Sequence, residues 1–352
     1  MFAPILFGLD TFGDASVDDR GNPVSHAKTI RELVAQAQLA DSLGLYGFGI
    51  GEHHREDFAV SAPDTVLAGM ATVTENIRLG TAVTILSTDD PVRVYERFAT
   101  LQALSNGRAE ISVGRGSYVE SFELFGYRAE DAFQLFEERL DLFAQLLTQL
   151  PVTWQGATRA SLKDTRVWPQ LETNLPMRMA VGGSPQSAER AAKLGAPLAL
   201  SVISGDPTRF ADYVATYRAG LSLHGWAQRQ VSVHGPGYIA ATDGQAIDEY
   251  WPYYDASYGR ISRERGQTHI DYDYFVREVE EGALYVGSAE TVAGKIARTV
   301  DALGVDRFDF KYNAGPMPHS ASMRNIEAYA REVSPAVNQL LSRDQAQAQL
   351  VG

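Results

Sequence analysis

Three short clusters of reactive residues follow three strand-like segments of this chain. The first is Glu52-His53-His54, and the others are Gly-Thr-Ala-Val at 80–83 and Gly-Arg-Gly-Ser-Tyr at 114–118. In a repeating strand-helix fold, the carboxyl ends of the parallel strands meet at one rim. We therefore expect the three clusters to form one active site.

The adjacent histidines suggest acid-base chemistry. A neutral imidazole near pH 7 accepts a proton or hydrogen-bonds a developing anion. Neighbouring side chains of an extended segment point to opposite sides, so we expect one of His53 and His54 to face the pocket and the other to be structural. The alternative is a buried histidine satisfied by Glu52 or by the backbone. Metal binding is not expected, because these side chains and Glu56 would have to converge and no helical histidine pair is present.

Two positively polarised features predict a phosphorylated ligand. Ser184 and Pro185 open a predicted helix, where backbone amides and the hydroxyls of Ser184 and Ser187 suit an anion. Arg115 lies between two glycines, where a ligand can approach the backbone closely and meet a guanidinium. Each feature alone is also compatible with an ordinary helix start or a surface arginine. The sequence contains neither a Walker loop nor a GxGxxG motif.

The elements that must position these groups alternate between strand and helix. Apolar runs predict strands at 5–9, 46–50, 77–86, 109–113, 177–181, 198–202, 237–241 and 308–312. Helical periodicity predicts helices at 26–43, 63–74, 91–104, 130–150, 185–194, 207–223, 244–258 and 289–303. This α/β alternation favours a single closed (β/α)8 TIM barrel over an open doubly wound sheet, and we predict one domain over residues 1–352.

Two insertions interrupt the repeat, at about 151–176 and 260–287, and the second carries a charged run over 260–266. Long insertions in compact domains are usually functional loops or lids, and the alternative for the charged run is a solvated surface. The side chains expected at the substrate pocket or lid are Asp10, His54, Asn313, Arg260 and Arg263.

The composition limits the classes of partner. The 352 residues are 45% hydrophobic and 21% charged, which describes an ordinary globular chain with a large core. A net charge of −13 and a pI near 5.0 disfavour nucleic acid and anionic membranes, so we expect a small-molecule substrate. Cysteine is absent, which excludes disulfides and thiolate chemistry. We see no signal peptide or membrane span and expect a cytoplasmic protein.

The order and spacing of these motifs resemble the bacterial luciferase-like flavin-dependent monooxygenases, and luciferase α chains in particular. The segments that carry the resemblance are 52–54, 77–83 with 91–93, 106–108, 114–118 with 125–126, 182–184 and 286–290. The similarity spans most of the chain and is weakest in the two insertions. It implies a (β/α)8 barrel that binds reduced FMN at the strand ends. It also implies a non-prolyl cis peptide bond between Ala82 and Val83.

The resemblance also implies roles for single residues. His53 matches the catalytic histidine, and Arg115 and Ser184 match phosphate ligands. The implied cofactor-binding positions are Thr81, Ala82, Val83, Arg115, Tyr118, Gly182, Gly183, Ser184 and Ser187. Two positions depart from the luciferase α chains: Gly114 replaces a cysteine beside the flavin, and Gly183 replaces an acidic residue. Both departures bear on aldehyde luminescence rather than on flavin binding.

The implied reaction is a monooxygenation in which reduced FMN and dioxygen form a flavin hydroperoxide, shielded by a lid, that oxidises a small organic substrate. A separate NAD(P)H:flavin reductase is expected, because no reductase module is visible. A homodimer is expected through the helices after the second and third strands, where Ala68, Gly69, Ala71 and Thr72 are small. Two alternatives remain open: a deazaflavin-dependent hydride-transfer oxidoreductase and a noncatalytic flavin-binding subunit.

Overall fold

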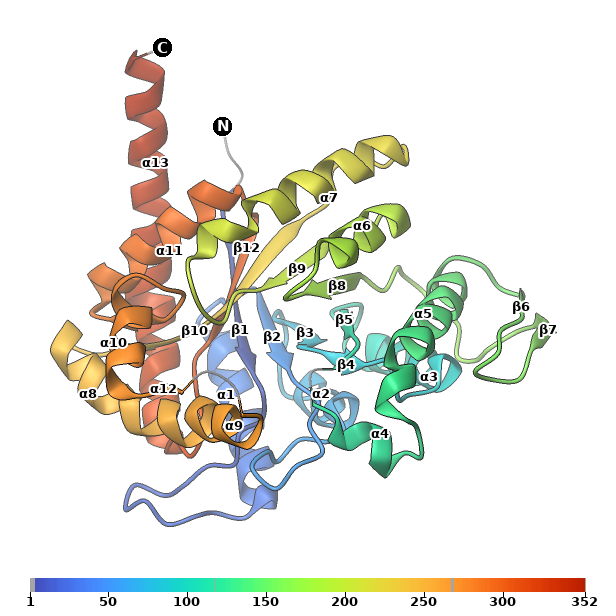
Figure 1. Cartoon of the computed structure of the whole chain (residues 1–352), viewed down its shortest axis with the longest axis horizontal. Coiled ribbons are helices and arrows are strands. Elements are labelled where there is room, and N and C mark those ends of the chain that lie inside the picture. The colour runs from blue at the N-terminus through green and yellow to red at the C-terminus, as the bar shows by residue number, and fades with distance from the viewer. Residues whose placement is uncertain (1–3, 117, 267–268, 352) are drawn as a thin grey trace.

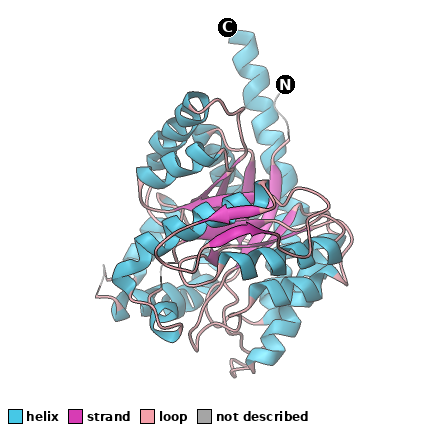
Figure 2. Cartoon of the chain, turned by 90° about the vertical axis from the view of Figure 1, so that its right-hand side faces the viewer, coloured by secondary structure: helices cyan, strands magenta, loops and turns pink. Residues whose placement is uncertain are grey.

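A parallel β-barrel surrounded by helices forms the centre of the molecule (Figure 2). The structure is a computed structural model that describes residues 4–116, 118–266 and 269–351, with side chains described up to residue 343. The barrel strands are β1 (Leu6–Thr11), β2 (Gly47–Ile50), β3 (Arg78–Thr81), β4 (Thr84–Ile85), β5 (Ile111–Gly114), β8 (Met177–Val181), β9 (Leu198–Ser201), β10 (Val231–Ile239) and β12 (Arg307–Lys311).

The barrel closes through β3 and β4, which together occupy one strand position. β3 pairs with β2, β4 pairs with β5, and Leu79 of β3 bridges to Ala109 just before β5. The remaining neighbours run β2-β1-β12-β10-β9-β8-β5, all in parallel. Counting β3 and β4 once gives eight strand positions. The predicted (β/α)8 barrel is confirmed.

Helices cover the outside of the barrel (Figure 1). They are α1 (His26–Ser42), α2 (Pro63–Ala71), α3 (Pro91–Leu104), α5 (Ala132–Thr148), α6 (Pro185–Leu194), α7 (Ala211–Leu223), α8 (Asp243–Tyr254), α11 (Ala289–Leu303), α12 (His319–Ala328) and α13 (Ser334–Val351). Local sequence fixes several starts: Ser25 caps α1 by accepting from Lys28 N, and Asp90 caps α3 before Pro91. The last two helices were not predicted. Among the described residues, no helix is both long and apolar enough to cross a membrane.

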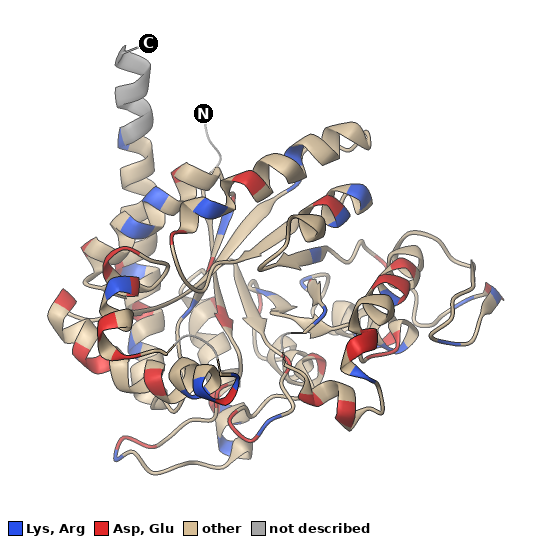
Figure 3. Cartoon of the chain, in the orientation of Figure 1, with Lys and Arg blue, Asp and Glu red and all other residues tan. Residues whose placement is uncertain are grey.

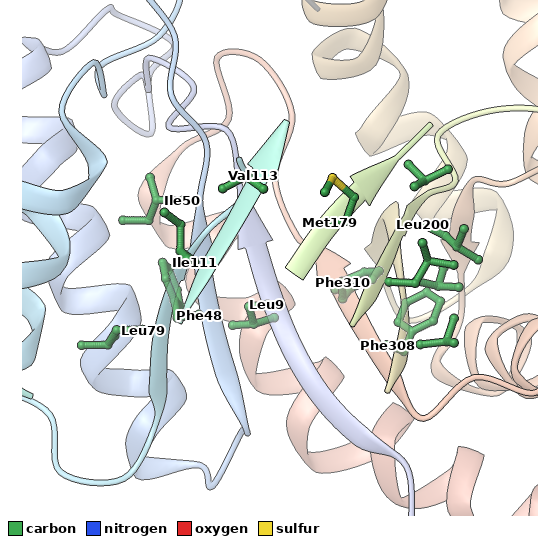
Figure 4. Close-up of a cluster of buried hydrophobic side chains, with 14 of the residues drawn as sticks. Leu9, Phe48, Ile50, Leu79, Ile111, Val113, Met179, Leu200, Phe308 and Phe310 are labelled. Carbon is green, nitrogen blue, oxygen red and sulfur yellow. The ribbon is translucent and has the colours of Figure 1, made fainter. Parts of the chain in front are cut away.

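The strands alternate between an apolar outer side and a small or charged inner side. Leu9, Phe48, Val113 and Phe308 belong to the buried hydrophobic cluster around the strands (Figure 4). Their neighbours along the strands include Asp10 and Asp309, which make ionic or hydrogen-bonded contacts across the barrel instead. The main apolar core therefore lies between the strands and the helices. The interior of this barrel is polar, whereas branched apolar side chains usually fill the interior of a TIM barrel.

Glycines make room for the charged interior. A Cβ at Gly49 would lie 1.9 Å from Asp10 Oδ1, and a Cβ at Gly8 would lie 2.1 Å from Asp309 Oδ1. Both distances are impossible for real atoms, so these positions require glycine while the carboxylates keep their places. The glycines on the inner side of β1 and β2 thus leave the space that the buried carboxylates of the barrel interior occupy.

A network of four buried charges occupies the barrel interior below the strand ends. Arg307 Nη1 donates to Glu110 Oε1 at 2.8 Å, and Arg307 Nε donates to Asp309 Oδ1 at 2.7 Å. Arg178 contacts the same two carboxylates, at 3.2 Å and 2.9 Å. Burial alone would raise the pKa of Glu110, but the arginines outweigh it and lower that pKa to about 2. Each buried charge therefore has a partner.

The insertions carry their own short elements. Residues 151–176 contain the antiparallel hairpin β6 (Val152–Trp154) and β7 (Leu162–Thr165). The second insertion contains α9 (Arg260–Glu264), α10 (Tyr272–Glu280) and β11 (Tyr285–Gly287), and a π-helical turn, Asp255–Gly259, joins α8 to α9. The strand predicted at 237–241 is corrected: β10 begins at Val231, and its last three residues pair with β11.

Candidate active site

A cavity of about 920 Å³ opens at the carboxyl ends of the barrel strands. Segments following β1, β2, β5 and β8 form its walls, and the segment from α8 to α10 forms its roof. We call it the rim cavity; the residues that line it and bear on its chemistry are Phe12, Glu52, His53, Ala82, Val83, Arg115, Tyr118, Gly182, Gly183, Ser184, Ser187, Tyr254, Tyr258 and Arg265. Three of the predicted clusters therefore meet, as the barrel topology requires.

His53 is a buried, neutral imidazole in the wall of the rim cavity. Its Nδ1 lies 3.1 Å from the Phe12 carbonyl oxygen, so Nδ1 carries the proton and Nε2 is left as an acceptor. The ring stacks on Phe58 at 4.0 Å and meets the Tyr118 ring edge-on at 5.0 Å. Burial is the main cause that lowers the pKa of His53 to about 3. The ring is thus fixed as a proton acceptor near neutral pH.

His54 points away from the rim cavity. Its Nε2 lies 3.0 Å from Glu52 Oε1, and it lines a separate cavity of about 200 Å³. The other carboxylate oxygen of Glu52, Oε2, accepts from the Ile85 amide at 2.9 Å. The two histidines therefore serve different cavities, as alternation in an extended segment predicts. The expectation that His54 lines the substrate pocket is not met by this geometry.

The loop after β5 provides a cationic side chain close to the backbone. Arg115 is exposed and lines the rim cavity. Gly116 follows with φ +81°, and a Cβ there would lie 2.8 Å from Ile85 Cγ2. Only glycine fits this turn without displacing β4. The loop can therefore turn sharply after Arg115, whose guanidinium remains at the rim cavity. Ser117 lies outside the described residues.

The first turn of α6, which follows the neighbouring strand β8, forms the next part of the cavity wall. Ser184 is the N-cap residue, but its hydroxyl contacts the Ser187 hydroxyl at 3.1 Å instead of a helix amide. Gly182 and Gly183 are exposed at the same turn. Arg190 reaches Ser187 Oγ at 3.5 Å, but its guanidinium pairs with Glu137 and it does not line the rim cavity. The hydroxyls of Ser184 and Ser187, the amide groups at this helix N-terminus and the Arg115 guanidinium are groups that suit a phosphate.

The bond between Ala82 and Val83 is a non-prolyl cis peptide, as the resemblance implies. Both residues line the rim cavity between β3 and β4. Thr81 does not line it, because its hydroxyl is fully buried and bonds to the Ser112 carbonyl at 3.1 Å. The strand predicted over 77–86 is therefore interrupted where it meets the cavity.

The roof of the rim cavity is held by ion pairs on its outer side. Arg55, in the loop after β2, contacts Asp57 at 2.9 Å and Glu264 of α9 at 2.7 Å, and it also contacts Glu120 of α4 (Glu120–Leu124). Basic and acidic residues lie side by side on α9 (Figure 3). One arginine thus connects three segments around the mouth.

Arg260 and Arg263 belong to this outer side and do not line the cavity. Arg260 pairs with Glu56 at 3.0 Å, and Arg263 pairs with Asp255 at 2.7 Å. The side chain that does reach inward is Arg265, whose guanidinium lies 4.6 Å from the centre of the Tyr118 ring. The predicted lid therefore exists as a roof, but its inward arginine is one that sequence reasoning did not select.

Two other predicted pocket residues lie below or beside the rim cavity. Asp10 is buried beneath it and bonds to His234 Nδ1 at 2.6 Å, in a chamber of about 50 Å³ that also contacts Ala82 and Val83. Burial and the charge of Asp309 raise the pKa of Asp10. Asn313 is buried, does not line the rim cavity, and its carbonyl oxygen accepts from Lys311.

Sequence reasoning also missed the aromatic roof. Tyr254 and Tyr258 stack at 4.8 Å and line the rim cavity together with Tyr274. The only available signal was the tyrosine-rich run at 250–258, which reads equally well as core packing. For metals, the described residues contain no cluster of three His, Asp or Glu side chains that could hold an ion.

A parallel barrel with a neutral imidazole and the N-terminus of α6 in one cavity at the strand ends has the architecture of a TIM-barrel enzyme, in which the active site lies at the carboxyl ends of the strands. The profile described as luciferase-like monooxygenase matches residues 11–307. The chain belongs to the luciferase-like monooxygenase family. The expectation of an oxygen-incorporating oxidoreductase is thereby confirmed at the level of the family.

Individual relatives have low sequence identity, but their alignments cover most of this chain. An uncharacterised protein of Sinorhizobium fredii, y4vJ, is 25% identical over 346 residues, covering 93% of this chain and 97% of the relative. The oxygenase component of a flavin-dependent trigonelline monooxygenase from Acinetobacter baylyi is 21% identical, covering 88% of this chain and 90% of the relative.

Solved structures agree on the fold. Monooxygenase RslO1 of Streptomyces bottropensis gives a TM-score of 0.81 at 22% identity, covering 94% of this chain and 99% of that one. The oxygenating constituent of 3,6-diketocamphane monooxygenase from Pseudomonas putida, in complex with FMN, gives 0.77 at 17% identity, with coverage of 95% and 99%. An F420-dependent secondary alcohol dehydrogenase gives 0.73 at 17% identity, with the same coverage.

Proposed function

We propose that this chain is an FMN-dependent monooxygenase that uses reduced FMN and dioxygen to oxidise a small organic substrate. The observation that carries the proposal is the pairing, in one cavity, of the buried neutral His53 with an anion-binding wall built by Arg115 and Ser184. The phosphate of a phosphorylated redox cofactor would bind to Arg115 and Ser184. The redox reaction of that cofactor would involve a proton that His53 can accept or hold.

The residues of the rim cavity fit FMN. Arg115, Ser184 and the amides of the α6 turn would hold the phosphate, and Ala82 and Val83 offer an apolar surface to the flat ring. The volume of about 920 Å³ is near the upper end for ligand pockets, which leaves room for an organic substrate. When bound, reduced FMN supplies the electrons that activate dioxygen.

The side chains of the rim cavity would position the reacting groups and shield them from water. His53 Nε2 would hold or move a proton, because its Nδ1 proton is committed to the Phe12 carbonyl. Phe58 and Tyr118 fix the plane of the imidazole. Tyr254 and Tyr258 in the roof exclude water, which strengthens electrostatic contacts and suppresses side reactions.

The proposal includes two partners. A separate NAD(P)H:flavin reductase would supply reduced FMN, which is supported by the relative described as the oxygenase component of a flavin-dependent monooxygenase. A homodimer would pack through α2 and α3; of the four small residues selected at the end of α2, Gly69 and Thr72 are exposed, Ala68 is half-buried and Ala71 is buried in the core. Light scattering that returns a monomer would contradict the dimer.

Deazaflavin-dependent hydride transfer is the second candidate, favoured by the fold similarity to the F420-dependent dehydrogenase. The deciding experiment titrates the purified chain anaerobically with reduced FMN and with reduced F420, and then admits oxygen. The monooxygenase proposal predicts tighter FMN binding and oxygen uptake by the complex. Preferential F420 binding without oxygen uptake supports hydride transfer. FMN binding with no effect on the oxygen reaction supports the noncatalytic subunit.

A further inference from the structure

The side cavity is a second, polar compartment beside the rim cavity. Its volume is about 200 Å³, and it is defined here by Glu52, His54, Asp64, Asp89, Arg97 and Phe125. Among the described residues, Glu52 alone lines both cavities. Glu52 is thus part of the wall between the two compartments.

Hydrogen bonds connect the compartments across this wall. Glu52 Oε1 lies 3.0 Å from His54 Nε2, and both side chains are more than nine-tenths buried. The edge of the His54 ring packs against Phe125, with ring centroids 5.0 Å apart. Imidazole and carboxylate in direct contact form a pair through which a proton can pass in either direction.

The groups around this pair are charged on both sides. In the side cavity, Arg97 of α3 contacts Asp64 of α2 at 3.3 Å and also contacts Asp89. In the rim cavity, the titratable and charged groups are His53, Arg115, Tyr118, Arg265 and Tyr274, with Tyr254 and Tyr258 in the roof. The side cavity therefore holds two carboxylates paired with one arginine, and the rim cavity holds two further arginines.

The proposed reaction needs such a connection, and the inference rests on that function. Reduced FMN, dioxygen and substrate give oxidised FMN, oxygenated substrate and water. The departing oxygen needs two protons, and a reduced flavin bound as its anion brings one, so one must come from solvent. FMN and substrate bound in the rim cavity would displace its water, and His53 holds its Nδ1 proton on the Phe12 carbonyl.

We propose that His54 and Glu52 form a proton route from the side cavity into the rim cavity. Glu52 also accepts from the Ile85 amide at 2.9 Å, which positions β4. A purely structural role for Glu52 is the competing explanation. The two explanations differ in whether small external acids can replace a missing side chain.

The first test uses His54→Ala, which leaves Glu52 and its bond to Ile85 in place. The protein is loaded anaerobically with reduced FMN, mixed with oxygen, and followed by the absorbance of oxidised FMN; without substrate, the products are oxidised FMN and hydrogen peroxide. We expect the reaction to slow by about 10–100-fold and imidazole to restore it in proportion to its concentration. Reduced-FMN affinity should be unchanged.

His224→Ala is the matched control, because His224 is exposed at the end of α7, away from both cavities. It should neither slow the reaction nor respond to imidazole. An unchanged rate in His54→Ala, or a slowed rate that imidazole does not restore, overturns the proton route. If the wild-type chain itself fails to bind reduced FMN or to react with oxygen, the proposed function fails instead.

The second test needs no cofactor and no cavity-forming variant. In the free protein, ¹⁵N NMR measures how fast the ring N–H protons exchange with water. The route predicts that the His54 ring N–H exchanges at least about tenfold faster than that of His53, because the His54 proton would pass between Glu52 and the side cavity while the His53 N–H is held on the Phe12 carbonyl. A third test returns to the protein loaded with reduced FMN: Glu52→Gln, which keeps the side-chain shape, should slow its oxygen reaction. Equal exchange rates of the two histidine ring N–H groups, or a wild-type rate of the oxygen reaction in Glu52→Gln, contradict the proposal.

Discussion

His53 shows how one side chain is tuned by its surroundings. Burial among Phe12, Phe58 and Tyr118 disfavours the charged form and lowers its pKa to about 3, whereas an exposed histidine titrates near 6.5. Between these two values, the unfolded chain binds a proton that the folded chain does not. The folded state is therefore destabilised as pH falls from about 6.5 toward 3.

Replacing His53 by Asn should remove this dependence. Between pH 7 and pH 5, the free energy of unfolding of the wild type should fall by about 2 kcal/mol more than that of His53→Asn, from a shift worth about 1.4 kcal/mol per pH unit. Urea unfolding at both pH values measures the difference. Equal losses in the two proteins would show that His53 titrates normally.

We also expect normal FMN binding and impaired oxygenation in His53→Asn.

Arg115 is the charged side chain proposed to hold the phosphate. Arg115→Ala should weaken FMN binding by about 10–100-fold, because a hydrogen bond to a charged group is worth about 1.5–3 kcal/mol. Quenching of flavin fluorescence measures the affinity. Arg31→Ala, at an exposed position of α1, is the control and should bind FMN normally. Unchanged affinity in Arg115→Ala would remove its role.

At the scale of elements, the loop after β2, α4 and α9 meet through Arg55. Replacing this arginine by methionine keeps much of the apolar stem but removes its contacts to Asp57, Glu120 and Glu264. We expect α9 to open about fivefold more often, because partly exposed pairs are worth up to about 1 kcal/mol. Hydrogen exchange of the α9 amides measures this. Arg128→Met, whose pairs stay within its own turn, should leave α9 unchanged.

The strand-helix alternation was predictable because each element has its own apolar period and punctuation. The helix Pro91–Leu104 and the strand Met177–Val181 occur where the sequence predicts them. The strand β10 was placed too late, because Gly235, Pro236 and Gly237 look like a turn. In the structure, the Tyr285 carbonyl lies 2.2 Å from where a Cβ of Gly237 would be, so that glycine allows β11 to approach.

The site was only partly predictable from the sequence. The glycines beside Arg115 and the Ser184-Pro185 turn predicted the backbone positions where a ligand can approach. The pair His53 and His54 predicted the histidine in the wall of the rim cavity. Directions of side chains depend on tertiary packing, which is why Thr81 and Asn313 turned out to be buried outside the cavity. Arg265 was missed because it is one of several charged residues in the run at 260–266, and nothing in the sequence shows which of them faces the cavity.

At the scale of the whole molecule, the barrel depends on paired charges inside it. Arg307 is fully buried between Glu110 and Asp309. Arg307→Met should cost about 3–5 kcal/mol of the free energy of unfolding, because it leaves buried carboxylates without their partner. Urea unfolding measures the cost. Arg93→Met, on the exposed side of α3, should change it by less than about 0.5 kcal/mol, and an equal effect of both changes would contradict the account.

A crystal structure of the chain with FMN tests the central claim most directly. The account predicts the phosphate within hydrogen-bond distance of Arg115 and Ser184, the flavin ring against Ala82 and Val83, and His53 Nε2 facing the same cavity. A phosphate bound elsewhere, or a ring outside the rim cavity, would contradict it.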